Sequence, residues 1–253
     1  MKPFFSRLFR GWSRVVTLGV SQINFIFPVR GINLGGGKWS KLGWRNIDSL
    51  HQKGRGESVF LTGDSVLPLA DGSVQMAYSS HFFEHIDDRT AQNLFLECYR
   101  VLNKGGVFRV SVPDFEMARS AYFAGDHAFF DEGDWGLKAR YENWESRGVV
   151  PSLENKLSFL LFNFETHDAG KLFPPWKYIP NYYCGPALIP RDLLKSKIEE
   201  LSTDQLSVWL RQHAPAEAAS LGHVNFYNFS KLDLMLRKAG FHIVELSAYR
   251  GSR

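Results

Sequence analysis

The segment INLGGGKWSKLGWRNID occupies residues 32–48 and gives the clearest indication of the fold. In it an apolar run breaks into Gly35, Gly36 and Gly37, and a second short apolar run closes at Asp48. Glycines let a ligand approach the backbone closely and permit φ angles closed to other residues. Three adjacent glycines also fit a plain tight turn. The acid that ends the next strand, with a carboxylate suited to a ribose diol, favours a site for a nucleotide-type cofactor.

Short apolar runs alternate with a helical pattern through the first half of the chain. Residues 87–102 carry apolar side chains at a helical period, and residues 103–106 (NKGG) are expected to stop that helix. Strands that alternate with helix-length segments pair in parallel through right-handed crossovers. The predicted fold class is therefore α/β, an open and mostly parallel sheet. Its strands are expected at residues 29–34, 44–47, 58–61, 74–78 and 107–112.

Small and polar residues follow the expected strands at their carboxyl ends. Open parallel sheets bind ligands just outside these ends. We therefore expect the residues there to converge on one site. They are the three glycines, Asp48, Asp64, Ser79, Ser80 and His81.

The pattern changes after the fifth expected strand. Residues 115–222 are dense in aromatic side chains and too long for a simple loop, so we expect an inserted, mainly helical cap. The chain then returns to the sheet domain, which is expected to take residues 29–114 and 223–253. A helix over residues 230–239 and a last strand over residues 241–249 are expected in its second part.

Residues 1–28 form a cationic leader. The first 47 residues contain no Asp or Glu, and apolar residues recur in the leader at the spacing of an amphipathic helix with arginines on its other face. Such a helix would either lie on an anionic membrane surface through residues 1–27 or pack its apolar face on the domain. Polar residues interrupt every window long enough to span a bilayer, and no cleavage site follows a clean apolar core.

The composition bounds the class of protein. A chain of 253 residues with 44% hydrophobic residues can bury one substantial core. Cys98 and Cys184 lack the spacing of a disulfide framework or a zinc site, so a cytoplasmic compartment is expected. The formal charge of +4 is accompanied by no recognised nucleic-acid-binding module, and nucleic acid is therefore not an expected partner.

Five segments in register resemble the class I S-adenosylmethionine-dependent methyltransferases, in particular small bacterial enzymes found among polysaccharide and cell-envelope genes. Residues 222–241 resemble the same family more weakly. The resemblance implies a Rossmann-like fold and S-adenosyl-L-methionine as the cofactor. The five segments are NLGGG at 33–37, GWRNID at 43–48, GDSVLP at 63–68, the run from DGSV to SSHFFEHI at 71–86, and YRVLNKGG with the following strand at 99–114.

The resemblance also implies roles for single residues. The glycine turn would pass under the methionine moiety, Asp48 would accept both ribose hydroxyls, and Asp64 with the backbone of Ser65 would meet the adenine edge. Asn33 stands where the family commonly has an acid, and Trp39 replaces a further glycine. The cofactor-binding residues expected on this basis are Asn33, Gly35, Gly36, Gly37, Asp48, Asp64, Ser65 and Ser80.

Methyl transfer to a hydroxyl needs a base as well as positioning. His81, directly after the fourth strand, is the expected catalytic base; Glu84, His85 and His223 are weaker candidates. The histidines at 81 and 85 also fit a structural role at the start of the following helix. His81, Glu84 and His85 match the H-x-x-E-H pattern of inverted zinc peptidases, but that pattern belongs inside a long helix, and here it follows a strand directly. No metal is therefore expected.

The function expected from these features is methyl transfer to a sugar, glycolipid or envelope intermediate. Such an acceptor suits the aromatic cap and a leader compatible with peripheral membrane contact. A non-catalytic cofactor-binding or membrane-attached accessory protein stays open, because Asn33 replaces the acid and the family's final strand lacks a counterpart. A dinucleotide oxidoreductase is disfavoured, since the three glycines lack the G-x-G-x-x-G spacing.

Overall fold

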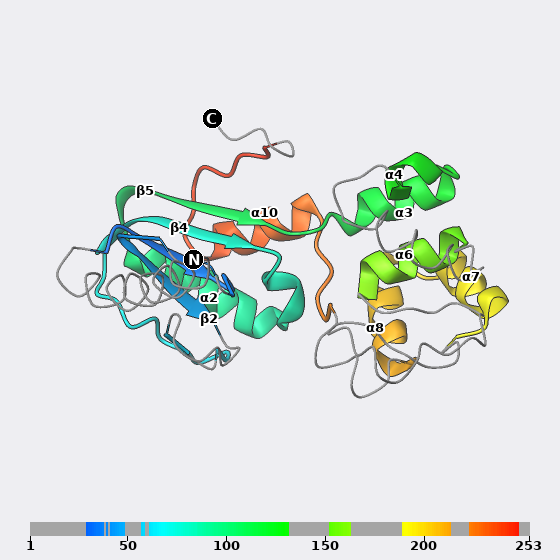
Figure 1. Ribbon diagram of the computed structural model, residues 1–253, viewed down its shortest axis with the longest axis horizontal. Helices are drawn as coiled ribbons and strands as arrows, with labels where there is room; N and C mark the ends of the chain where they lie inside the picture. The colour runs from blue at the N-terminus through cyan, green and yellow to red at the C-terminus, as the bar shows by residue number, and fades with distance from the viewer. Residues whose placement is uncertain are drawn as a thin grey trace, which may run out of the picture. The chain divides into compact units, whose positions relative to one another are not determined.

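The computed structural model describes residues 29–37, 39, 41–48, 57–58, 61–131, 152–162, 189–213 and 223–247 (Figure 1). The leader helix predicted over residues 1–28 lies outside this part of the chain. Contacts divide the chain into two compact units. The sheet unit comprises the described residues as far as Phe83, then Asp88–Val112, and those from Asp233 onward; the helical unit comprises Glu84–Asp87 and the described residues of Pro113–Leu232.

Five parallel strands form the centre of the sheet unit. Strand β1 lies in the middle of the sheet, and all four of its residues are buried, as expected for a parallel strand covered on both faces. The chain order reverses at β1, so the carboxyl ends of β1 and β4 meet at a topological switch point. The predicted Rossmann-like parallel sheet is confirmed. Its strands are β1 (Gly31–Leu34), β2 (Trp44–Asp48), β3 (Glu57–Ser58), β4 (Val74–Ser80) and β5 (Leu102–Ser111), in the order β3-β2-β1-β4-β5.

The helix predicted over residues 87–102 is confirmed as α2 (Asp88–Val101). Its apolar residues recur at helical spacing and are buried on one face. Phe95 on that face contacts Phe108 of β5, with the ring centroids 5.9 Å apart. The buried apolar residues of the helix are Ala91, Leu94, Phe95, Cys98 and Val101.

The later helix predicted over residues 230–239 is confirmed as α10 (Phe229–Lys238). Its contact with α2 is made partly through the Gln92 side chain, whose Nε2 donates to the carbonyl oxygen of Met235 at 3.1 Å. Helix α10 therefore closes against an element that lies far from it in the sequence.

Strand β5 begins earlier than the sequence predicts. Residues 103–106, predicted to stop α2, belong to β5, which starts directly after the helix. The pairing with β4 steps from Val74↔Leu102 to Met76↔Val107, so β5 carries extra residues at this point. Gly105 takes a φ of +79° there, a conformation that lets the strand bulge.

The strand predicted over residues 241–249 is wrong for residues 241–247, which are described and have no regular structure. Phe241 packs against Tyr99 and Phe108, with centroid distances of 5.3 and 5.8 Å. Ile243 and Leu246, however, are 82% and 74% exposed. The alternating burial that would fix a strand against the sheet is not formed. Strand β3 is likewise displaced from the predicted 58–61, since Leu61 lies outside it.

The helical unit confirms that the insertion after strand five is mainly helical in its described part. Asp114 caps its first helix, because one carboxylate oxygen accepts from the N–H groups of Glu116 and Met117, both at 3.1 Å. A buried cluster that includes Phe115, Leu157 and Leu206 joins several of its helices. None of the helices that the structure describes combines the length and hydrophobicity needed to cross a bilayer. The helices of this unit are α3 (Phe115–Phe123), α4 (His127–Asp131), α6 (Leu153–Phe162), α7 (Arg191–Glu200) and α8 (Thr203–His213).

Candidate functional site

The three glycines after β1 are required for different reasons. Gly35 has a φ of +69°, and a Cβ atom there would lie 2.4 Å from the Phe82 ring. A Cβ atom at Gly36 would lie 2.1 Å from Asn33 Nδ2 and 2.2 Å from Asn46 Oδ1. Gly37 has a φ of +53°, and no described atom would lie within 4 Å of its Cβ. The turn is therefore packed from below at its first two positions and open at the third.

Residues at the carboxyl end of strand β2 hold this turn through hydrogen bonds. The N–H of Gly37 donates to Asp48 Oδ2 at 2.7 Å, and the Asn46 side-chain Nδ2 donates to the carbonyl oxygen of Gly37 at 2.9 Å. The N–H of Gly35 donates to the carbonyl oxygen of Ile47 at 2.9 Å. The structure thus brings the glycine turn and Asp48 together at one edge of the sheet.

Two asparagines lie beneath the turn on neighbouring strands. Asn33 of β1 is paired in register with Asn46 of β2, and both side chains are buried. Among the described residues, Asn46 Oδ1 accepts no hydrogen bond. The two amides occupy the space that a side chain at position 36 would need, so they hold the turn close to the sheet. Asn46 was not among the predicted site residues, although it shares a strand face with Asp48, two positions later.

The end of β4 adjoins the same edge. The Ser79 hydroxyl donates to the carbonyl oxygen of Leu34 at 3.1 Å, which ties β4 to the last residue of β1. Ser80 is half-buried and ends the strand. His81 follows with a φ of +52°, uncommon for a residue with a side chain, and its N–H donates to the carbonyl oxygen of Ser111 at 3.0 Å. The His81 side chain is exposed.

Asp64 and Ser65 lie on a separate loop over residues 62–65. The Asp64 carboxylate accepts from Arg89 Nη2 at 2.7 and 3.0 Å, and both side chains are largely exposed. The Ser65 carbonyl oxygen accepts from the Asn93 side chain at 2.8 Å. These bonds join the loop to α2. An exposed ion pair such as Asp64–Arg89 contributes about 0–1 kcal/mol, so a ligand can replace it at small cost.

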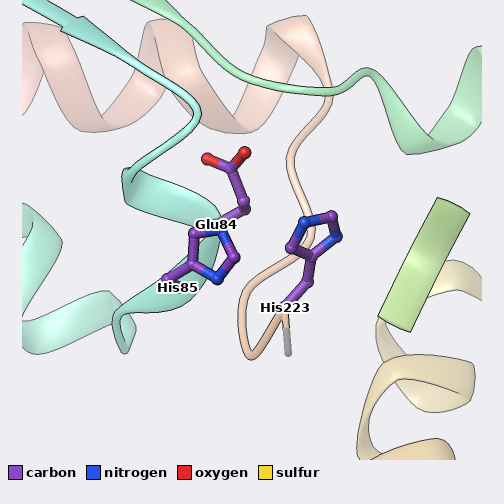
Figure 2. A group of neighbouring side chains, drawn as sticks. All are labelled: Glu84, His85 and His223. Carbon is purple, nitrogen blue, oxygen red and sulfur yellow. The ribbon is translucent and has the colours of Figure 1, made fainter. Parts of the chain in front are cut away.

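The helical unit contains a second group of polar side chains. Glu84 and His85 end the short 3-10 helix η1 (Phe83–His85), and His223 precedes α10 (Figure 2). One potential ligand atom from each of the three lies within 4.8 Å of the others. Glu84 is fully buried, and the imidazoles of His85 and His223 meet edge to face with centroids 4.8 Å apart. We call these three residues the His–Glu cluster.

Backbone bonds position the His–Glu cluster. The N–H groups of Val224 and Asn225 both donate to the carbonyl oxygen of Glu84, at 2.7 and 3.1 Å. The His223 Nδ1 atom lies 3.1 Å from the carbonyl oxygen of Leu160. The sequence predicted each member of the cluster as a lesser base candidate, without indicating that they gather.

The zinc-peptidase pattern is not formed as the sequence motif requires. His81 is not part of the metal-capable group found among the described residues. The segment forms a single 3-10 turn over Phe83–His85 in place of a long helix, and His81 before it has a left-handed backbone. Two histidines on one helical turn are therefore not presented to a common ion.

A buried polar network follows the His–Glu cluster along the chain. The Asn225 side-chain Nδ2 donates to the Tyr227 hydroxyl at 2.9 Å, and Lys231 Nζ donates to Asn225 Oδ1 at 2.7 Å. The Lys231 ammonium also lies 5.4 Å from the centroid of the Tyr227 ring. This network fixes the backbone directly after His223.

Part of the chain matches a known protein family. Residues 45–110 match the family model described as a methyltransferase domain. The matched segment runs from β2 into β5 and includes Asp48 and Asp64, and it begins after the glycine turn. No curated protein matches the chain.

Proposed function

Because the chain belongs, through residues 45–110, to the class I S-adenosylmethionine-dependent methyltransferases, we propose that it transfers a methyl group from S-adenosyl-L-methionine to a sugar, glycolipid or envelope intermediate. The hydrogen bond from the Gly37 N–H to Asp48 Oδ2, 2.7 Å long, is the observation that carries the proposal. It joins the side-chain-free turn to a carboxylate at the carboxyl ends of β1 and β2, the edge at which open parallel sheets bind their ligands.

The residues at this edge fit the cofactor. The turn is free of side chains, and a Cβ atom at Gly36 would collide with both buried asparagines, so backbone is the surface offered to a ligand. Asn46 Oδ1 supplies a buried acceptor beneath it. A bound S-adenosylmethionine would meet the turn and Asn33 with its methionine part and Asp48 with its ribose hydroxyls. Asp64 and Ser65 would receive the adenine, and Ser80 would line the end of β4.

The cofactor supplies a methyl group activated by a sulfonium, and the protein has to position and deprotonate the acceptor. Positioning lowers the barrier most, because a displacement needs the attacking atom in line. For a hydroxyl acceptor, His81 takes the proton; its exposed side chain directly after β4 is what supports this role. The strained backbone of His81 is of the kind that fixed functional positions show.

The helical unit, taken by itself, exposes the kind of surface on which sugars bind. Its described surface exposes Phe123 and Met117, which are 55% and 58% exposed. Arg119 lies over the Phe123 ring, 5.4 Å from its centroid. The Arg119 guanidinium is held there by hydrogen bonds to Thr203 and to the carbonyl oxygen of Ile198, so the exposed ring is the surface that a sugar could use, through its apolar face. Residues 1–27 would add peripheral membrane contact on the cytoplasmic face.

Calorimetric titration with S-adenosylmethionine and S-adenosylhomocysteine tests the proposal. We expect low- to mid-micromolar binding, on the order of −7 to −8 kcal/mol, to the intact protein. Asp48→Ala should lose most of it, whereas Asp233→Ala, which removes an acid paired with Arg237 on the same helix, should bind as the wild type does. The proposal fails if neither compound binds. Binding without methyl transfer to any fraction of a cell extract would instead indicate the accessory protein.

A further inference from the structure

We propose that the His–Glu cluster, formed by Glu84, His85 and His223, is a binding site for a divalent transition-metal ion of the Zn²⁺ class (Figure 2). All three residues belong to the helical unit. The site goes beyond the methyl-transfer proposal, and neither depends on the other.

The donor set selects the class of ion. Two imidazole nitrogens and one carboxylate oxygen are ligands of Zn²⁺ and of neighbouring first-row ions such as Co²⁺. Mg²⁺ and Ca²⁺ prefer oxygen ligands throughout. Three protein ligands also leave at least one coordination position for an oxygen of water or of a substrate, as in catalytic zinc sites.

The geometry is close to that of a loaded site. The three ligand atoms lie within 4.8 Å of one another. Ligands at about 2.0–2.1 Å from a tetrahedral ion lie roughly 3.4 Å apart, so binding draws the most distant pair together by about 1.4 Å. Side-chain rotation covers this distance. The backbone is already fixed, because Val224 and Asn225 donate to the carbonyl oxygen of Glu84.

A backbone carbonyl sets the tautomer of His223. The Leu160 carbonyl oxygen, 3.1 Å from His223 Nδ1, can accept a proton but cannot donate one. Neutral His223 therefore carries its proton on Nδ1 and presents a lone pair at Nε2. A bond from the non-ligating nitrogen to a backbone carbonyl is the common outer-shell arrangement of metal-binding histidines. The Phe115 ring packs beside this imidazole, with the ring centroids 5.7 Å apart.

The electrostatics favour a cation over a neutral ligand. Glu84 is fully buried, and a carboxylate removed from water is costly to ionise. A divalent ion bound to it offsets that cost. Each imidazole binds a metal through a nitrogen lone pair and adds no negative charge, so a divalent ion held by one carboxylate keeps a net positive charge that attracts an oxygen anion or hydroxyl.

Titration of the chelator-treated full-length protein with Co²⁺ and Zn²⁺ tests the site. We expect one ion per chain at micromolar affinity or tighter, and a visible d–d spectrum for the Co²⁺ form. Glu84→Gln, His85→Ala and His223→Ala should each weaken binding by at least about tenfold. His127→Ala, which removes an exposed histidine of the same unit, should bind as the wild type does. Equal binding by all four variants, or no binding by the wild type, would overturn the proposal.

A measurement on the wild type alone guards against variants that fail to fold. X-ray absorption of the Zn²⁺-loaded protein should show nitrogen and oxygen neighbours with multiple scattering from two imidazoles. Sulfur scattering, or scattering from fewer than two imidazoles, would place the ion elsewhere and overturn the assignment. Cofactor titration is read separately, so failure of the metal site leaves the methyl-transfer proposal standing, and the reverse also holds.

Discussion

The glycine turn of the sheet unit and the His–Glu cluster of the helical unit are assembled in opposite ways. The turn joins residues 33–48, which are near neighbours in the sequence, through bonds between adjacent parallel strands. The cluster joins Glu84 and His85 to His223 from a distant part of the chain, through backbone bonds that Val224 and Asn225 donate to Glu84. The glycine turn requires residues without a side chain, whereas the His–Glu cluster requires its three side chains. We expect substitutions to damage them in different ways.

The largest effect should come from adding a side chain to the turn. In Gly35→Ala the new methyl meets the Phe82 ring at 2.4 Å in a backbone with a φ of +69°. Overpacking and left-handed strain together should lower the free energy of unfolding by about 3 kcal/mol. Gly37→Ala, with a φ of +53° and no described atom within 4 Å, should lose about 1 kcal/mol from strain alone. Urea denaturation measures both, and equal losses would show that packing against Phe82 is not what requires glycine.

Loss of a backbone hydrogen bond that positions the His–Glu cluster should have the next largest effect on stability. Val224→Pro removes the N–H that donates to the carbonyl oxygen of Glu84 at 2.7 Å but leaves all three side chains of the cluster in place. We expect a loss of about 1–2 kcal/mol in unfolding free energy and about tenfold weaker Co²⁺ binding. Val224→Ala retains the N–H and is the matched control. Undiminished Co²⁺ affinity in the proline variant would mean that the cluster does not need this long-range tie.

A smaller effect is expected from the asparagine beneath the turn. Asn46→Ala removes the hydrogen bond to the carbonyl oxygen of Gly37 and the buried acceptor Oδ1. Stability should fall by about 1 kcal/mol, and affinity for S-adenosylhomocysteine should fall with it. Calorimetry on the folded variant separates the two losses. Unchanged affinity would limit Asn46 to a structural role.

The smallest effect concerns the acid sensitivity of the sheet unit. Paired hydrogen bonds from the Arg100 guanidinium hold the pKa of Glu97 below its ordinary value of 4.5, and the Leu67 N–H adds a further bond. A lowered folded pKa means that this contribution is complete above pH 4.5 and is lost as the pH falls through the folded pKa. Glu97→Gln should therefore cost about 0.5 kcal/mol at neutral pH and less in acid. A wild-type and variant difference that stays constant from neutral to acid pH would contradict this.

The sequence predicted the strands and helices that depend on interactions between residues close together in the chain. The glycines and Asp48 mark the ends of β1 and β2, and the apolar period of α2 follows from burial of one helix face. The start of β5 was missed, because the bulge at Gly105 depends on pairing with β4. The strand predicted after residue 241 is not formed over residues 241–247, where the described part of the chain leaves Ile243 and Leu246 largely exposed.

The residues of the candidate sites also differ in how far the local sequence predicts them. The motif that ends at Asp48 was sufficient to indicate the turn, and strand alternation could have added Asn46 to it. The gathering of Glu84, His85 and His223 was not predictable, since no short-range spacing encodes the backbone bonds of Val224 and Asn225. Clusters of this kind follow from tertiary contacts, which a single sequence does not display.

The methyl-transfer proposal requires the glycine turn and Asp48 to hold one molecule of the cofactor, with the acid on its ribose. A thermodynamic cycle measures this contact, through the calorimetric affinities of S-adenosylhomocysteine and its 2′-deoxy analogue for the wild type and for Asp48→Asn. The variant keeps an oxygen that can accept from Gly37 N–H, so the turn should survive. We predict that removing the hydroxyl weakens binding to the wild type but barely affects the variant, a coupling of about 1–3 kcal/mol. Additive losses from the two changes would contradict the claim.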